Sequence, residues 1–258
     1  MKRIMGLLVL TVVLMVPTTD FAASDQLGIY VAPKFTFGGL MGHDTKFNWS
    51  TTESGKTGLP DSKSGKVAMD GDWIYGGALA IGYDFYPRFD VPIRLEAEYA
   101  MFGDAKSKHH YNSVSSVTGD WQRETSKTTI GIQTLFANVY YDFHNSSSFT
   151  PYIGGGLGVS FVDMKGSNFE GDHDGSESFS MKKKTSTNFA WNLGAGVGYA
   201  FTDNISLDVG YRFTGVGEGE TKNTNTSGTS HHPGKTTEKW KTDDLYIHQV
   251  MVGLRFTL

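Results

Sequence analysis

Residues 189–201 read Phe-Ala-Trp-Asn-Leu-Gly-Ala-Gly-Val-Gly-Tyr-Ala-Phe. Each odd position carries an apolar or aromatic side chain, whereas the even positions carry only Ala, Asn or Gly. A period of two is typical of a β-strand with two unlike faces, because successive side chains of a strand point to opposite sides. The stretch also exceeds the roughly 9–11 residues that a tilted strand needs to cross a bilayer. It therefore predicts a membrane-spanning strand.

The same alternation occurs seven more times along the chain. The other predicted strands lie at 27–37, 78–85, 93–101, 134–143, 152–161, 205–214 and 246–258. An even number of strands that are apolar on one face is typical of an antiparallel barrel in a membrane. A soluble β-sandwich also has alternating strands, but its second face would not consist mainly of Gly, Ala and charged residues. We therefore expect an all-β fold, an eight-stranded up-and-down transmembrane β-barrel.

The connections between these strands alternate between short and long. Short connections lie around 87–89, 144–149 and 202–203, and long polar ones lie at 39–72, 103–127, 164–186 and 215–244. Structureless segments longer than about 15 residues are uncommon in soluble domains. Outer-membrane barrels, in contrast, have short periplasmic turns and long external loops. We expect the four long segments to be mobile, structureless external loops.

Aromatic residues recur where three of the predicted strands end. Tyr83-Asp84-Phe85, Tyr141-Asp142-Phe143 and Tyr199-Ala200-Phe201 begin at positions 83, 141 and 199, which are 58 residues apart in both cases. Each interval is one two-stranded unit. Aromatic side chains collect where a barrel meets the boundary between lipid and water, so these residues predict the inner edge of the membrane-spanning region.

The first residues carry an export signal. Lys2 and Arg3 precede an apolar run over 4–16, and Pro17 and the small residues 22–24 follow it. This order is typical of a cleaved secretory signal peptide, and the run is shorter than the ~20 residues of a membrane-spanning helix. We expect a signal peptide at 1–24 and an outer-membrane β-barrel domain at 25–258.

Composition excludes several other classes of protein. Aromatic residues make up 13% of the chain, which excludes a disordered polypeptide. The net charge is −4 without a basic stripe, so nucleic acid is not an expected partner. The absence of Cys excludes a disulfide scaffold, a Cys-ligated zinc and a thiol nucleophile. We expect a monomer.

Nine charged residues fall on the predicted inner face of the barrel. They are Lys34, Asp84, Arg94, Glu96, Glu98, Asp142, Asp208, Arg212 and Arg255. An eight-stranded barrel is only wide enough for side chains to fill it, and buried charges are tolerated when they are paired. A hairpin centred near Phe89 would set Asp84 opposite Arg94. We interpret the charges as a structural plug; a narrow ion path is the alternative.

The sequence predicts no catalytic residue, metal site or cofactor. The histidines are His43, His109, His110, His144, His173, His231, His232 and His248, and six of them lie in the long polar segments. No Ser–His–acid set at one inward position is evident, although a triad is defined by spatial geometry. Asp172-His173-Asp174 and the two His-His pairs could together bind a metal ion at the surface. However, their spacing is irregular and metal selectivity would be weak, so we do not predict a metal site.

One hairpin carries a resemblance to a known family. Residues 138–143, Asn-Val-Tyr-Tyr-Asp-Phe, and 150–159, Thr-Pro-Tyr-Ile-Gly-Gly-Gly-Leu-Gly-Val, resemble the central hairpin of the small outer-membrane β-barrel proteins. That porin family includes opacity proteins, OmpX-like barrels and the OmpA transmembrane domain. The resemblance implies location in the Gram-negative outer membrane. The last strand resembles the signal for the barrel-assembly machinery, but it ends in Leu258, where the family usually has Phe or Trp.

These observations lead to one main hypothesis and two alternatives. The main hypothesis is a non-enzymatic surface protein, a plugged barrel that displays long loops. Its expected partners are outer-membrane lipids and lipopolysaccharide, the barrel-assembly machinery, and a host, phage or envelope partner through the loops. The alternatives are a small passive channel for ions or polar solutes and a lipid-modifying enzyme, because such barrels serve many roles on one scaffold.

Overall fold

The computed structural model describes residues 27–42, 45–51, 62–67, 72–114, 121–172, 175–180, 182–225 and 236–258. The predicted signal peptide lies outside the described residues. Within them, no helix has the length and apolar composition needed to cross a membrane.

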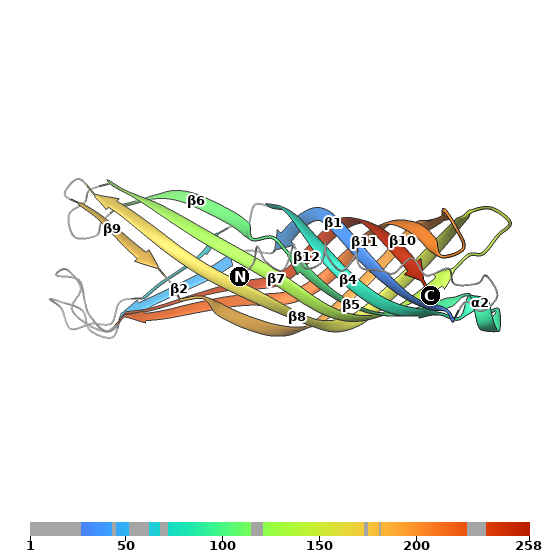
Figure 1. Cartoon of the computed structure of the whole chain (residues 1–258). Coiled ribbons are helices and arrows are strands. Elements are labelled where there is room, and N and C mark those ends of the chain that lie inside the picture. The colour runs from blue at the N-terminus through green and yellow to red at the C-terminus, as the bar shows by residue number, and fades with distance from the viewer. Residues whose placement is uncertain are drawn as a thin grey trace.

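Eight long strands form a closed antiparallel barrel. They are β1 (Ile29–Gly42), β4 (Asp72–Asp84), β5 (Ile93–Phe102), β7 (Trp121–Asp142), β8 (Phe149–Asp172), β10 (Lys184–Ala200), β11 (Ile205–Asn225) and β12 (Thr236–Thr257). Each strand pairs with the next in this order, and β12 pairs with β1 to close the ring. The predicted eight-stranded up-and-down barrel is confirmed. The short turns and the one-turn helix α2 (Tyr86–Phe89) lie at one end of the molecule, called here the turn end (Figure 1).

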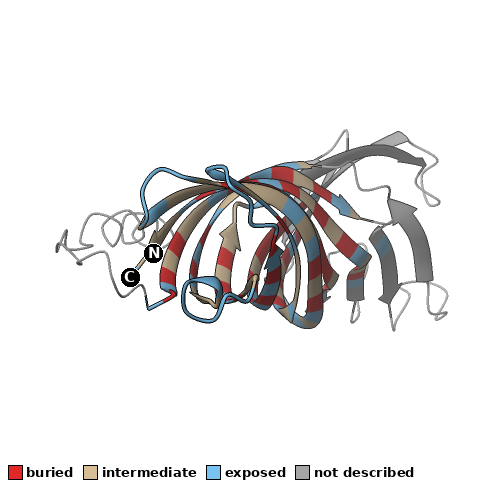
Figure 2. Cartoon of the chain, turned by 90° about the vertical axis from the view of Figure 1, so that its right-hand side faces the viewer, coloured by how far each residue is buried: buried red, intermediate tan, exposed pale blue. Residues whose placement is uncertain are grey.

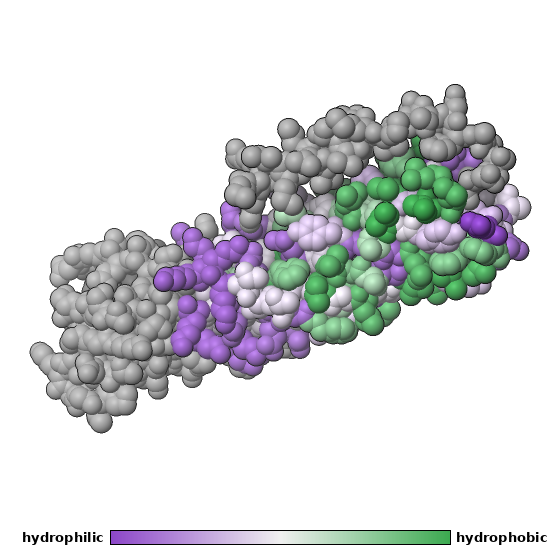
Figure 3. All heavy atoms as spheres, turned by 60° about the horizontal axis from the view of Figure 1, so that its bottom comes forward, coloured by the Kyte–Doolittle hydropathy of each residue, from purple (hydrophilic) through white to green (hydrophobic). Residues whose placement is uncertain are grey.

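Side chains alternate between the two faces of the barrel wall. Ile81, Leu157 and Leu193 on the outer face are 57–63% exposed, whereas Ala80 and Asn192 on the inner face are buried. The alternation is visible as bands of colour along each strand (Figure 2). Apolar residues gather over the half of the molecule nearer the turn end (Figure 3). This surface is a band suited to lipid, as the period of two predicts.

Two sets of aromatic rings border the apolar band. At the turn end, Tyr141 contacts Phe143 and Tyr199 contacts Phe201, with ring centroids 5.0 and 5.1 Å apart. These pairs agree with the predicted inner edge. At the other edge, Trp191 lies 5.5 Å from Phe213. Phe213 also stacks on Tyr246, and Phe37 on Trp73. These aromatic side chains around the far edge of the band are called here the outer aromatic ring. They were not predicted from the sequence.

The four long polar segments are not structureless where the structure describes them, so that expectation is wrong. They contain β2 (Thr45–Thr51), β3 (Ser62–Val67), β6 (Ala105–Val114) and β9 (Gly175–Ser180). β2 pairs with β12 and β3, β6 pairs with β7, and β9 pairs with β8. With the distal parts of β7, β8, β11 and β12, these strands extend the barrel away from the turn end (Figure 1). We call this part the β extension.

The two faces of the strands exchange character where the β extension begins. On β7, the exposed residues Leu135 and Val139 are followed outward by the exposed Lys127. On the inner face of the same strand, the polar Asn138 gives way to Ile130. Among the described side chains, the lower barrel, which is the part between the turn end and the outer aromatic ring, is therefore apolar outside and polar inside, whereas the base of the β extension is polar outside and apolar inside. This inversion explains why the segments read as polar loops.

The inner face of the β extension and its base forms one hydrophobic cluster, called here the apolar layer. Its buried members are Leu40, Ile74, Ala105, Ile130, Ile132, Val162, Met164, Val216, Trp240, Leu245 and Ile247. Phe102 packs against it from the side. Burial of apolar surface stabilises a structure in water, so the base of the β extension has an apolar core.

Candidate functional site

Charged side chains from opposite walls meet inside the lower barrel. Lys34 on β1 donates to Glu96 and Glu98 on β5, and both Nζ–O distances are 2.6 Å. Glu96 also accepts hydrogen bonds from the Tyr30 and Tyr140 hydroxyls at 3.2 Å each. Tyr30, Glu96, Glu98 and Tyr140 are buried, and the Lys34 side chain is only 8% exposed. Hydrogen bonds and ion pairs thus cross the lumen at the level of Lys34 and Glu96.

Arg212 on β11 joins the same set of contacts from a third side. Its guanidinium bonds both carboxylate oxygens of Glu98, and it donates to the Tyr140 hydroxyl at 2.9 Å. Asn192 and Asn138 bond each other at 2.9 Å beside it. Lys34, Glu96, Glu98 and Arg212, with Arg94 and Asp142, are called here the charge network. It contains three cations and three carboxylates.

Arg94 pairs with a different residue from the one that the sequence suggested. Asp84 does lie opposite Arg94 in the register of β4 and β5. However, Arg94 donates to Asp142 on its other neighbour, β7, with Nε–Oδ2 at 2.5 Å and a second bond at 2.9 Å. Asp84 instead accepts a hydrogen bond from the main-chain N–H of Tyr86. Each barrel strand has two neighbours, and hairpin register considers only one.

The remaining two predicted charges lie near the turn end. Arg255 on β12 faces Asp208 on β11 with an Nε–Oδ2 distance of 3.6 Å. Together with Asp84, these are the predicted interior charges that stand apart from the charge network. Buried ion pairs of this kind gain little net stability, but loss of one partner leaves a costly unpaired charge.

The barrel wall is interrupted between β10 and β11, just beyond the outer aromatic ring. The β10–β11 ladder ends at the pair Trp191–Gly215. Beyond it, β11 shifts register against β12 at Gly215, Gly217 and Gly219. Gly217 has a φ of 75°, a backbone conformation that favours glycine. Val216 keeps the inward phase of Arg212 and Thr214 and is fully buried in the apolar layer, whereas beyond the irregularity the odd-numbered Thr221 is the buried residue.

Side chains replace backbone hydrogen bonds at this interruption, called here the β10–β11 seam. The Asn188 amide donates to the main-chain oxygens of Val216 and Glu218, at 3.2 and 2.8 Å. The Ser160 hydroxyl also donates to the Val216 oxygen, at 2.5 Å. Thr221 bonds the main-chain oxygen of Lys182 farther out. The seam is therefore held closed by polar side chains.

The outer face of β11 and β12 in the β extension carries lysines and carboxylates. Glu220 bonds Lys184 and lies 3.4 Å from Lys239. The hydrogen bond from Lys184 and the neighbouring Lys239 lower the pKa of Glu220. Lys241 pairs with Glu218 at 2.7 Å, and this bond raises the pKa of Lys241. Lys46 on β2 pairs with Asp243.

The described histidines do not form a site. His144 stacks on Tyr86 at the turn end, with ring centroids 3.5 Å apart. His248 lies on the outer face of β12 and bonds the Tyr211 hydroxyl through Nδ1 at 2.5 Å. The side chains of the other six lie outside the described part. Within that part, no cluster of three or more His, Cys, Asp or Glu is suited to a metal ion.

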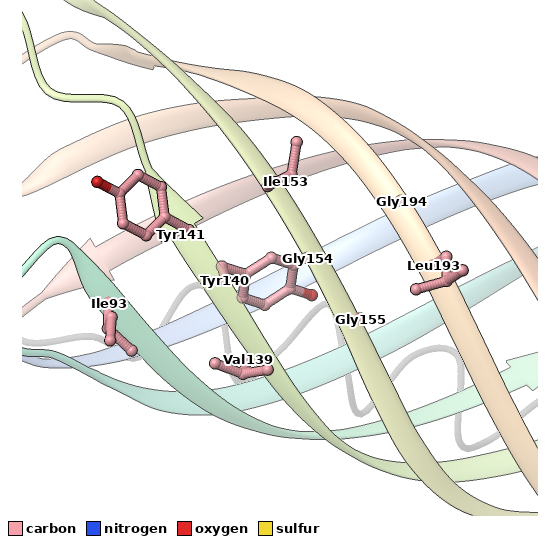
Figure 4. A pocket seen from close by; sticks show the side chains of 9 residues that line it. All are labelled: Ile93, Val139, Tyr140, Tyr141, Ile153, Gly154, Gly155, Leu193 and Gly194. Atoms are coloured by element: carbon pink, nitrogen blue, oxygen red, sulfur yellow. The ribbon is translucent and has the colours of Figure 1, made fainter.

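An apolar groove of about 470 Å³ lies on the outer face of the lower barrel. Gly155 leaves a notch between Val139 and Leu193, its neighbours in register on β7 and β10 (Figure 4). Ile153 and Tyr141 also line the groove. Because these side chains face away from the lumen, the groove belongs to the surface of the apolar band.

A family model described as outer membrane protein beta-barrel domain matches residues 8–256. The chain belongs to this outer-membrane β-barrel family. Its location is therefore the outer membrane, with the turn end on the periplasmic side and the β extension outside.

Two relatives and one solved structure are similar to this chain. Outer membrane protein PagN of Salmonella typhimurium is 33% identical over 211 residues, which cover 81% of this chain and 83% of PagN. A putative adhesin of Rickettsia bellii is 29% identical, covering 76% of this chain and 80% of the relative. Neisserial surface protein A is similar in structure with a TM-score of 0.44 and 17% identity, covering 90% of this chain and 97% of that one.

For this family member, the sequence interpretation missed the apolar layer and the β10–β11 seam. A signal for the layer was available, because Ile130 and Ile132 continue the inward phase of Asn138 on β7. The seam had only the run of alternate glycines at 215, 217 and 219 as a signal. Glycine there is required by backbone geometry, which a pattern of hydropathy does not report.

Proposed function

We propose that this outer-membrane barrel is an adhesin-type surface protein, in which the β extension holds the tips of its hairpins away from the membrane to contact another cell. The observation that carries the proposal is the exchange of faces on β7 and the neighbouring strands, which, among the described side chains, gives the base of the β extension an apolar core and a polar exterior. Such a body stands in water without a partner. The relatives named outer membrane protein and putative adhesin support a surface role.

The reach of the β extension suits this role. From Leu135, near the outer aromatic ring, to Trp121 at its start, β7 continues for 14 residues. At ~3.4 Å per residue and a tilt of ~45°, this length rises about 30 Å above the lipid. The hairpin tips are then carried through the sugar layer of the outer leaflet, where short loops would stay hidden.

The interior supports a non-conducting, non-enzymatic barrel over the channel alternative. The charge network fills the lower lumen with ion pairs from β1, β5, β7 and β11. The apolar layer lies above it, and hydrophobic constrictions oppose the passage of ions by excluding water. We propose that both together close the barrel. Outer-membrane lipids and lipopolysaccharide surround it, and the barrel-assembly machinery acts on β12.

A deletion at one tip tests the proposed function. Asn225 on β11 and Thr236 on β12 lie opposite each other in register, so residues 226–235 can be replaced by a two-residue Asn-Gly turn. Bacteria with this variant should show wild-type amounts of folded barrel and reduced adherence to cultured animal cells. The same replacement of 115–120, between Val114 and Trp121, tests a second tip. If bacteria lacking both tips adhere like wild type, the proposed function is wrong.

A further inference from the structure

The outer face of the β extension contains cross-strand pairs of lysines. Lys222 on β11 lies directly opposite Lys239 on β12. Lys46 on β2 lies opposite Lys241 on β12. Like charges directly opposite each other destabilise a sheet, so each such pair calls for a source of negative charge.

In the row nearer the membrane, the protein supplies that charge itself. Lys241 is held by Glu218 at 2.7 Å and lies 3.9 Å from Asp243. Lys46 bonds the other oxygen of Asp243. The two lysines thus share two carboxylates, and this row is compensated.

In the row farther out, the described side chains include fewer carboxylates than lysines. Lys184 and Lys239 share the single carboxylate of Glu220. Lys222 has no acidic partner among the described side chains. Lys184, Lys222 and Lys239 are called here the lysine cluster; among the described side chains, they place three positive charges around the one carboxylate of Glu220.

The position of the lysine cluster indicates which anion it meets. Lys184 is seven residues beyond Trp191 on β10, and Lys239 is seven residues from Tyr246 on β12. Trp191 and Tyr246 belong to the outer aromatic ring, so the cluster stands about 15–20 Å above the lipid boundary. The outer leaflet of this membrane is lipopolysaccharide, whose phosphorylated sugars lie directly above the acyl chains.

We propose that the lysine cluster binds phosphate groups of lipopolysaccharide, and so fixes the β extension in the sugar layer around it. Lysine ammonium groups form strong charge-assisted hydrogen bonds with phosphate oxygens. A phosphate between Lys222 and Lys239 removes their mutual repulsion. The inference deepens the proposed function, on which it rests for the placement of the β extension in the sugar layer above the lipid.

The experiment uses the purified full-length barrel, refolded into phosphatidylcholine vesicles with or without lipopolysaccharide. The measurement is the temperature at which the folded band on a gel is lost. Phosphorylated lipopolysaccharide should raise this temperature, and lipopolysaccharide stripped of its phosphates should raise it less. The Lys222→Gln/Lys239→Gln variant should lose more than half of the phosphate-dependent rise, and salt at about 0.5 M should weaken the rise in the wild type.

Lys241→Gln is the matched control, because it removes one charge from the compensated row of the same face and should keep the rise. Two results would overturn the proposal: an equal rise with stripped lipopolysaccharide, or an undiminished rise in the double variant. A third would also do so, namely a double variant that keeps the rise but no longer binds immobilised dextran sulfate, which would assign the cluster to a sulfated glycan. Adherence of the tip deletions is a separate readout, so failure of the proposed function is distinguishable.

Discussion

Arg94 on β5 and Asp142 on β7 form a two-bond ion pair inside the barrel, with both side chains almost fully buried. The Arg94 guanidinium also lies 5.0 Å from the ring centre of Tyr140 and 5.1 Å from that of Tyr152. The pair therefore joins two adjacent strands at the periplasmic end of the charge network.

Removal of one partner of this pair should cost more than removal of both. Arg94→Ala leaves the Asp142 carboxylate buried without a cation, which should lower the free energy of unfolding by about 3–5 kcal/mol. Urea unfolding of the refolded protein in detergent measures this loss. The Arg94→Ala/Asp142→Ala double variant should recover part of it. Equal stability of Arg94→Ala and wild type would show that the pair is not structurally important.

Loss of the Asn188 amide should weaken the β10–β11 seam. Asn188→Ala leaves the Glu218 oxygen without this donor and the Val216 oxygen with only Ser160. Because these two hydrogen bonds are only partly buried or exposed, their loss should lower the free energy of unfolding by about 0.5–1.5 kcal/mol, and the same unfolding assay measures it. Thr187→Ala, an exposed neighbour on the same strand, is the control. Faster amide hydrogen exchange at 216–219 than in wild type would locate the effect at the seam. A decrease in the free energy of unfolding no larger than that of Thr187→Ala would contradict this prediction.

A charge placed in the middle of the apolar band should impair membrane insertion. Ala195 faces outward on β10, four residues from both Trp191 and Tyr199. Arginine on the lipid face at mid-membrane costs about 2–4 kcal/mol, so Ala195→Arg should slow refolding into vesicles. Thr187→Arg, on the same face of the same strand but beyond the outer aromatic ring, should insert like wild type. The assignment of the lipid band fails if the two variants behave alike.

The barrel should carry little or no steady current in planar bilayers. The Arg94→Ala variant should also remain silent, because the apolar layer above the charge network is unchanged by that substitution. Large, cation-selective open levels in the unmodified protein would instead favour the passive channel. Openings in the variant alone would show that the charge network, and not the apolar layer, closes the lumen.

The strands and the direction of their side chains were predictable because one constraint, lipid outside and polar groups inside, applies to every pair of successive residues in these strands. Arg212 and Glu98 could be placed in the lumen on this basis alone. Their pairing could not, because β5 and β11 are not adjacent and side chains from all sides reach the axis of a narrow barrel.

The β extension was not predicted from the sequence, and the reason is related. Beyond Gln133 on β7 the solvent outside the wall changes from lipid to water, so the rule that assigns apolar residues to the outer face reverses. Lys127 then marks the exterior and Ile130 the interior. A reader of the sequence sees polar residues increase and infers a loop, although the period of two persists.

The exchange of faces along β7 has a consequence for how such proteins can change in length over evolution. An insertion of one residue between Ile132 and Gln133 would turn every more distal side chain of that strand to the opposite face, bringing Ile130 into water and Lys127 into the core. An insertion of two residues would preserve both faces. Natural variation in the height of this structure should therefore follow parity, with paired strands gaining or losing residues in even numbers.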